Sequence, residues 1–144
     1  MIVFRFFGYL FLLLTVYLSI AFISYLFTWQ ADLDPVLRYS WQLILSNDIE
    51  VANWVGKGGA VLAHQFIYDG FGIAAFLILP MLARFGLDLS RIAVKLPFDI
   101  SSKSLFPFMI LLSIVFGLLM GGSTFPWGGA LGDMVTSFFG GPLL

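Results

Sequence analysis

Several features common in soluble proteins are absent or scarce in this chain, and each absence excludes a class of function. The 144 residues contain no cysteine and one histidine. Disulfides, cysteine-ligated metals and thiol chemistry are therefore excluded, and a single histidine without a cysteine partner gives no zinc site. Only 10% of the residues are charged and the net charge is −1, so the sequence offers no basic stripe for nucleic acid. We expect no metal, no cofactor and no direct nucleic-acid contact by this chain.

Apolar residues are what the chain has in abundance. They make up 60% of the sequence, and the charged fraction falls far below the roughly 25% of a soluble domain. The first apolar run, residues 6–29, holds 24 residues without a charge and would measure about 36 Å as a helix, enough to cross a membrane. It is too long for the apolar part of a signal peptide. Two more runs cover residues 59–83 and 105–122, so the sequence predicts an all-α integral membrane protein.

The two polar loops between these runs predict the orientation of the chain. Residues 84–103 hold four of the seven lysine and arginine residues, whereas the longer loop 30–57 holds only Arg38 and Lys57. The positive-inside rule places loop 84–103 in the cytoplasm and loop 30–57 outside, and Arg5 puts the N-terminus in the cytoplasm. All four tryptophans fall in or beside the outer loops, which predicts an aromatic belt at one membrane interface: Trp29, Trp41, Trp54 and Trp127.

Local signals predict three further features. Asp34–Pro35 indicates a turn or a helix start, followed by a short helix lying on the membrane surface. Ser90 is expected to cap a short helix that runs through residue 96 and is stopped by Pro97. Pro107 falls in the first turn of the third span, where its missing N–H does no harm.

A short glycine motif occurs twice. Residues 58–60 and 128–130 both read GGA, separated by 70 positions, and each copy follows an apolar run and a tryptophan-bearing turn. This spacing predicts helical hairpin repeats with the order span, outer loop, GGA segment. Residues 128–144 would rise only about 25 Å as a helix, so we predict three complete spans plus an incomplete fourth and expect the chain to begin a longer protein. Seven glycines are predicted to pack helices closely or to kink them: Gly58, Gly59, Gly70, Gly117, Gly121, Gly128 and Gly129.

Three polar residues lie inside the second span. In one continuous helix, Asp69 would sit near the bilayer midplane, where a carboxylate costs about 2.5–3.5 kcal/mol. Gln65 lies four residues earlier on the same face and could share a hydrogen bond with it, whereas His64, five residues earlier, would point elsewhere. Since the first and third runs hold no ionisable residue other than tyrosine, we favour a structural role. Asp69 then faces the bundle, or is exposed to water by a break near Gly70, and His64 is a packed interface residue.

No P-loop and no nucleophile–base constellation is present, so the chain is not expected to be an enzyme. Two stretches carry a family resemblance. Residues 53–64 and 66–72 read NWVGKGGAVLAH and FIYDGFG, followed by Leu79–Pro80, and residues 125–132 read FPWGGALG. These motifs resemble the second span and the entry to the fourth span of the membrane domain of the FtsK/SpoIIIE bacterial DNA translocases. The resemblance covers the whole chain.

The resemblance implies a four-span anchor in the bacterial inner membrane with both ends in the cytoplasm. In the family a linker and a hexameric RecA-like ATPase follow, and the anchor holds this motor at the division septum beside division proteins. This chain has neither a Walker motif nor a winged-helix DNA reader, so the resemblance implies anchoring and septal association rather than DNA pumping. The implied partners are the lipid bilayer, division proteins and the translocase motor, and a homo-oligomer is a further partner to test. The alternatives are a small membrane subunit of a transport or proton-conducting complex that uses Asp69 and His64, or an accessory scaffold subunit.

Overall fold

The computed structural model describes residues 2–92 and 102–142, and within these ranges all regular structure is helical. Three stretches of the described residues are long and apolar enough to cross a membrane: Val3–Leu45, Gly56–Ser90 and Lys103–Met120. The fold is therefore all-α and that of a membrane protein, as predicted. The α-helices are α1 (Ile2–Tyr39), α2 (Gly56–Ala63), α3 (Ile78–Ser90), α4 (Ser102–Met120) and α5 (Gly129–Phe138). Tighter or wider helical turns join them: η1 (Ser40–Leu45), η2 (His64–Phe71) and η3 (Gly72–Leu77).

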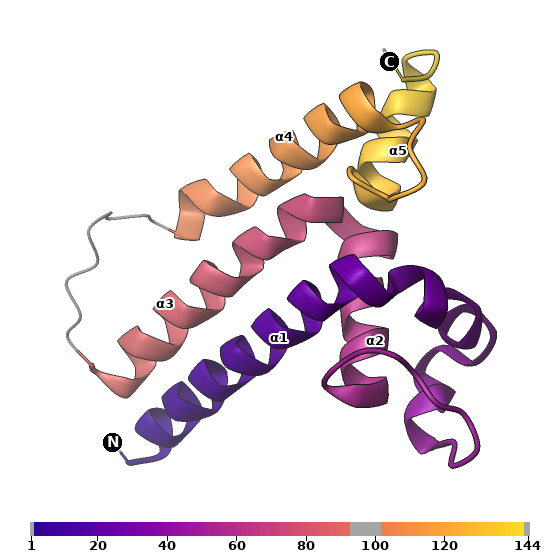
Figure 1. The fold of residues 1–144 in the computed structure, drawn as a ribbon. Coiled ribbons are helices and arrows are strands. Elements are labelled where there is room, and N and C mark those ends of the chain that lie inside the picture. The colour runs from indigo at the N-terminus through magenta and orange to yellow at the C-terminus, as the bar shows by residue number, and fades with distance from the viewer. Residues whose placement is uncertain (1, 93–101, 143–144) are drawn as a thin grey trace.

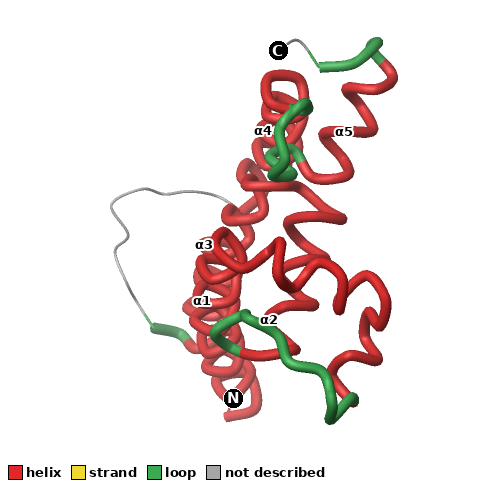
Figure 2. Tube along the Cα trace, turned by 45° about the vertical axis from the view of Figure 1, so that its right-hand side comes forward, coloured by secondary structure: helices red, strands yellow, loops and turns green. Residues whose placement is uncertain are grey.

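The helices α1 and α3 lie side by side in opposite directions (Figures 1 and 2). Small residues bring the two backbones together, because a Cβ atom added to Gly8 would lie 2.4 Å from the backbone nitrogen of Ser90. The rings of Phe11 and Phe85 meet edge to face at 5.0 Å. On the far side of α3 in Figure 1 lies α4, and α5 runs along the C-terminal half of α4.

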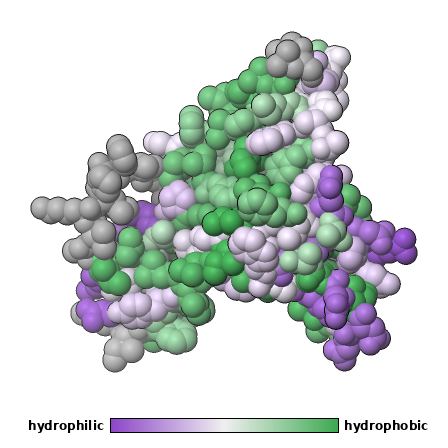
Figure 3. Space-filling model, viewed as in Figure 1, coloured by the Kyte–Doolittle hydropathy of each residue, from purple (hydrophilic) through white to green (hydrophobic). Residues whose placement is uncertain are grey.

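Hydrophobic residues dominate the face shown in Figure 3 over α1, α3 and α4. Hydrophilic residues gather at the end where α1 begins and α3 ends, and again over the segment between α1 and α2. A membrane protein needs this distribution, because its apolar middle faces hydrocarbon and its polar ends face water.

The first helix is longer than predicted. We expected the span to end at residue 29 and a turn or new helix to begin at Asp34–Pro35, and this was wrong: α1 continues through Pro35 to Tyr39. A proline inside a helix removes one backbone hydrogen bond, but here tertiary packing overrides that preference. Val36 and Leu43 are buried against Ala60 and Val61 of α2. The expected surface helix is thus the end of α1 followed by η1, folded onto α2.

The boundaries around the second loop also differ from the prediction. The helix expected to end at residue 83 continues as α3 to Ser90, and an exposed ion pair joins Arg84 and Asp88 at 3.2 Å. Ser90 does not begin a helix: its hydroxyl donates to the carbonyl of Leu87, and Arg91 ends the helix in a left-handed conformation. The rest of the expected helix, through residue 96, and Pro97 lie outside the described residues.

The third span begins slightly earlier than expected. We placed its start at residue 105, but α4 begins at Ser102, so Pro107 lies in the second turn rather than the first. The helix remains regular because the N–H missing from Pro107 would have bonded to the carbonyl of residue 103, close to the helix start. The helix ends at Met120, near the predicted limit of 122.

Candidate functional site: the break in the second segment

The second segment is not one helix, and the ring of Phe22 on α1 shows this directly. Its centroid lies 6.0 Å from that of Phe66 and 5.5 Å from that of Phe76. In a straight α-helix, residues ten positions apart are about 15 Å apart along the axis, too far for both rings to contact one side chain. The prediction of a continuous span over residues 59–83 was therefore wrong.

Before the break, the chain runs in the same direction as α1. A Cβ atom on Gly58 would meet the hydroxyl of Tyr17 at 2.8 Å, and one on Gly59 would meet the Cβ of Ala21 at 3.4 Å. Further along, His64 reaches Tyr25. The contacts advance together on both helices, so α2 and η2 follow α1, and only η3 and α3 return antiparallel to it.

Two glycines make the reversal possible. Gly70 has φ −110° and ψ −111°, outside the helical region. Gly72 has φ +63° and ψ −142°, a combination open essentially only to glycine. A break near Gly70 was one of the two structural roles expected around Asp69, and the backbone shows that break.

The turn just before the break is a π-helix, and it changes which polar residues meet. We expected His64 not to pair within its own helix, because five residues of an α-helix place it far round the axis. In η2 the backbone bonds span five residues rather than four, so His64 and Asp69 fall one above the other. The His64 Nε2 and Asp69 Oδ1 atoms are 3.8 Å apart. The expectation that His64 points away from Asp69 was therefore wrong, although 3.8 Å is longer than a hydrogen bond.

His64 is buried among aromatic side chains. A 3.0 Å hydrogen bond joins its Nδ1 to the hydroxyl of Tyr25, and its ring stacks on Tyr68 with centroids 4.6 Å apart. Its Nε2 has no hydrogen-bond partner among the described residues, since Asp69 is too distant for one. Gln65 is exposed, and within the described ranges no hydrogen bond joins it to Asp69.

Asp69 lies immediately before the break at Gly70 and Gly72, and its side chain is 45% exposed. The predicted midplane position assumed one continuous helix from residue 59, and the break removes that assumption. At the same end of the molecule, Ile73 lines an apolar cavity with Trp29 and Trp127. Asp69 therefore lies at the tryptophan-bearing end of α1 rather than halfway along it.

A set of polar contacts that the sequence analysis missed ties the segment before α2 to α1. Asp32 is 1% exposed, and one of its carboxylate oxygens accepts the N–H of Ala52 at 2.5 Å. Ser24 accepts the N–H of Trp54 at 2.9 Å, and the amide of Asn53 donates to the carbonyl of Ala21 at 3.1 Å. We call these three contacts the polar ladder. The signal available in the sequence was a run of small polar residues on one side of an otherwise apolar helix.

At the break, the second segment meets the start of the second GGA motif. The N–H of Ile73 donates to the carbonyl of Trp127 at 2.9 Å. A Cβ atom on Gly72 would lie 1.9 Å from that carbonyl oxygen, and one on Gly129 would lie 2.5 Å from the carbonyl oxygen of Gly70. We call these contacts, of Gly72 with the Trp127 carbonyl and of Gly129 with the backbone of Gly70 and Gly72, the glycine junction. Only glycine allows backbones to approach this closely.

The glycine contacts continue along α4 and α5. The hydroxyl of Ser113 donates to the carbonyl of Gly128 at 2.6 Å. A Cβ atom on Gly117 would lie 2.6 Å from the backbone of Gly132. Gly121 is exposed, and its added Cβ would lie 3.1 Å from Pro142. As with α1 and α2, the contacts advance together, so α5 runs in the same direction as α4.

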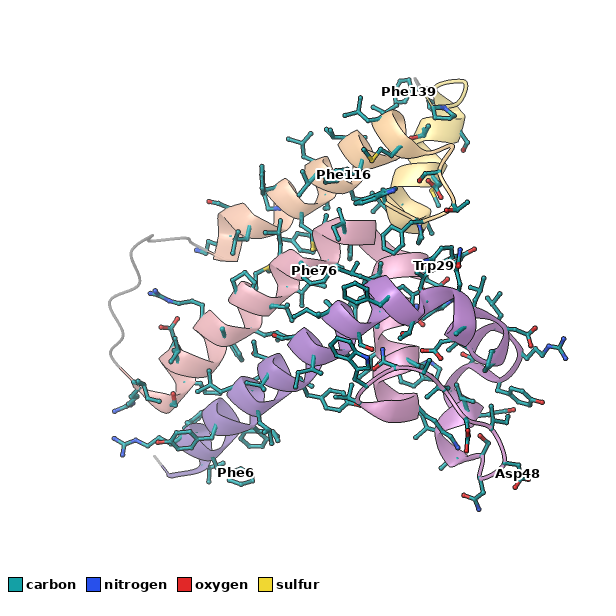
Figure 4. All side chains as sticks on the ribbon, viewed as in Figure 1. Phe6, Trp29, Asp48, Phe76, Phe116 and Phe139 are labelled. Atoms are coloured by element: carbon teal, nitrogen blue, oxygen red, sulfur yellow. The ribbon has the colours of Figure 1, made fainter. Side chains whose placement is uncertain are left out.

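The turn between α4 and α5 is aromatic. The ring of Phe125 lies 5.7 Å from Trp29 and 5.1 Å from Trp127, and Trp127 in turn lies 6.2 Å from Phe116. Figure 4 labels Trp29 on α1 and Phe116 on α4, on the two sides of this turn. Trp54 stacks on Phe27 of α1, whereas Trp41 is exposed on η1. Trp29 and Trp54 therefore lie at or beside residues 27–29 of α1, and Trp127 lies just before α5.

This arrangement positions backbones rather than reacting groups. Among residues 2–92 and 102–142, no three histidine, cysteine or acidic side chains lie close enough to hold a metal ion. The polar groups at the break serve hydrogen bonding between segments. The chain is thus a helical membrane protein with several spans. Its helices α1 and α4 are each followed by a glycine-rich helix that runs beside them in the same direction.

The comparisons with known proteins give the family. A family model for the 4TM region of DNA translocase FtsK/SpoIIIE matches residues 4–141. The chain belongs to this family, and as its 4TM region it is a membrane anchor and not itself a motor. A search of curated proteins and a search of solved structures found no match.

Proposed function

We propose that this chain anchors a DNA translocase at the division septum, where the motor couples chromosome segregation to cell division. The observation that carries the proposal is the family match over residues 4–141, which covers both repeats and the glycine junction between them. The described residues form packed helices joined by turns, an arrangement that suits a positioning domain. The proposed partners are the lipid bilayer, division proteins and the translocase motor.

The proposed location is the bacterial inner membrane with the N-terminus in the cytoplasm. The charge distribution supports this orientation, since Arg5 precedes the first apolar run and four of the seven basic residues fall in the sequence 84–103, between the second and third runs. The tryptophans beside the glycine junction and the polar ladder then face the outer interface. With this orientation α1 crosses outward, and η3 with α3 crosses back.

Reporter fusions test the orientation. A reporter that is active only outside the cytoplasm is expected to work when fused near Ser46 and to fail when fused near Ser101. The reverse pattern would contradict the topology and, with it, the proposed septal anchor.

Localisation tests the function itself. Residues 1–144 fused to a fluorescent protein are expected to gather at the septum, to hydrolyse no ATP and to bind no DNA. The matched control is the same fusion carrying Gly72→Ala, which should disrupt the glycine junction. Uniform membrane fluorescence from the unaltered fusion would refute the septal assignment.

The oligomeric state is a separate proposal. Helix contacts in lipid contribute modestly, about 0.6–2 kcal/mol for each polar or close contact. Native mass spectrometry of residues 1–144 is therefore expected to show mostly monomer or small, weakly held oligomers. The motor domain, rather than this chain, would then specify the hexameric ring. A stable hexamer of this chain alone would show that the spans specify the ring.

A further inference from the structure

The turn between α4 and α5 separates two cavities that share two aromatic walls. One cavity, of about 200 Å³, is lined by Tyr68, Phe125, Trp127 and Asp133, together with Ser123 and Thr124. The other, of about 370 Å³, is lined by Leu26, Trp29, Ile73, Phe125 and Trp127. The first has a mixed polar and aromatic lining, whereas every residue lining the second is apolar or aromatic.

The lining of the smaller cavity fits a cation. Among the described residues that line it, Asp133 carries the only formal charge. The aromatic residues Tyr68, Phe125 and Trp127 also line it, and the rings of Phe125 and Trp127 are steeply inclined to each other at 69°. Aromatic faces attract ammonium groups, and a carboxylate adds a charge-assisted hydrogen bond. An anionic group would meet Asp133 with no basic residue beside it.

The hydrogen-bonding groups favour a primary ammonium over a quaternary one. A primary ammonium has three N–H donors, whereas a quaternary ammonium has none. The cavity offers the carboxylate of Asp133 and the hydroxyl oxygens of Ser123 and Thr124 as acceptors. The hydroxyl of Ser123 donates its own hydrogen to the carbonyl of Phe125, which leaves its lone pairs free to accept.

The position of the two cavities matches the two parts of a phospholipid. Trp127 lines both cavities and Trp29 lines the apolar one, and tryptophan gathers at the depth of lipid headgroups. The apolar cavity begins at the same Phe125 and Trp127 walls and is large enough for several methylene groups of an acyl chain. At headgroup depth the abundant cationic group is the amine of a phospholipid. Its positive charge complements the carboxylate of Asp133, so a phospholipid amine is the expected occupant of the smaller cavity.

We propose that these two cavities form a binding site for a phospholipid with a primary-amine headgroup. The ammonium lies against Asp133 within the aromatic walls of the smaller cavity, and an acyl chain lies in the apolar cavity. Such a lipid would fill the space between Leu26 and Trp29 of α1 and the α4–α5 turn.

Native mass spectrometry of the purified chain in detergent tests the site. The chain is mixed with equal amounts of phosphatidylethanolamine, phosphatidylcholine and phosphatidylglycerol, and the retained lipid is measured. Phosphatidylethanolamine is expected to be retained most. Asp133→Asn should lower its retention about tenfold, the loss of one charge-assisted hydrogen bond, and Asp133→Glu should keep most of it.

Asp48→Asn is the matched control, because Asp48 is an exposed carboxylate in the segment between η1 and α2, away from the turn (Figure 4). It should leave lipid retention unchanged, and circular dichroism should show the same helical content in all variants. Equal retention of phosphatidylcholine, or an Asp133→Asn variant that holds phosphatidylethanolamine as well as the parent, would overturn the proposal. Failure to retain any lipid while a lysine-bearing peptide binds in an Asp133-dependent way would also overturn it and assign the site to a protein partner.

Discussion

The pairs α1–α2 and α4–α5 share one arrangement but are held by different interactions. In both, a long helix is followed by a turn and by a GGA helix that runs beside it in the same direction. The first pair is joined by the polar ladder and by the bond between Tyr25 and His64. The second pair is joined by glycine backbones in direct contact, with one hydroxyl bond from Ser113.

The difference shows that a repeated sequence motif need not repeat its contacts. Gly58 and Gly128 occupy the same place in the two motifs. A Cβ atom on Gly58 would meet only the tip of the Tyr17 side chain, whereas one on Gly128 would meet the backbone of Gly117 and the carbonyl of Ser113. A side-chain tip can move, but a helix backbone cannot move without repacking. The first pair should therefore tolerate small changes that the second does not.

The largest effect is expected at the glycine junction that joins the two pairs. Gly72→Ala combines a strained backbone at φ +63° with a Cβ atom 1.9 Å from the carbonyl oxygen of Trp127. Strain and overpacking cost about 1–3 kcal/mol each, so we expect a loss of about 2–6 kcal/mol in the free energy of unfolding in detergent. Gly56→Ala is the control: its φ is +73°, but nothing lies within 4 Å of the added atom. The control should lose only about 1–2 kcal/mol, and equal losses would show that the close approach is unimportant.

The next effect compares the two motifs at equivalent positions. Gly128→Ala places a Cβ atom 2.6 Å from the backbone nitrogen of Gly117, and we expect a loss of about 1–3 kcal/mol in the free energy of unfolding. Gly58→Ala should cost less than about 1 kcal/mol, because the Tyr17 side chain can turn aside. Denaturant unfolding followed by tryptophan fluorescence measures both. If Gly58→Ala proved the more harmful of the two, the distinction between the helix pairs would be wrong.

A smaller effect is expected from the polar contacts of the first pair. Tyr25→Phe removes the hydroxyl bonded to Nδ1 of buried His64 and should lower the free energy of unfolding by about 0.5–1.5 kcal/mol. Tyr9→Phe serves as the control, because Tyr9 is exposed on the same helix. The same unfolding assay applies, and an equal loss from both variants would mean that the Tyr25 hydroxyl contributes nothing specific.

The smallest effect is expected at Asp69. Asp69→Asn keeps the shape and hydrogen-bonding ability of a half-exposed side chain, so stability, membrane insertion and septal localisation should change little, by less than about 0.5 kcal/mol in the free energy of unfolding. An ion-flux assay in liposomes is the second measurement. An Asp69-dependent proton or ion flux from the unaltered chain would favour the transport alternative over the anchor.

The sequence predicted the helical class, the apolar runs and the loops that separate them, because charge and hydropathy alone determine which residues can lie in lipid. It also predicted two similar segments from the GGA motif. It did not predict that the second segment reverses, since hydropathy cannot distinguish one long span from a half-helix followed by a span. The continuation of α1 through Pro35 was missed because it depends on Val36 and Leu43 packing against α2, a contact between distant residues.

The polar residues at the break were misplaced for a related reason. An α-helical spacing separates His64 from Asp69, and only the π-helical turn brings their side chains to 3.8 Å. Such a turn depends on the backbone freedom of Gly70 and Gly72 and on the contact with Trp127. The glycines are visible in the sequence, but the tertiary contact that they make possible cannot be predicted from it.

Photo-crosslinking from position 22 tests the reversal of the second segment most directly. Phe22 is replaced in the full chain by a diazirine-bearing phenylalanine, and the products are mapped by mass spectrometry after irradiation in detergent. The account predicts adducts at both Phe66 and Phe76, because the Phe22 ring lies within 6.0 Å of the first and 5.5 Å of the second. Adducts confined to one of these two sites would mean that the second segment crosses as a single continuous helix, and the account would be contradicted.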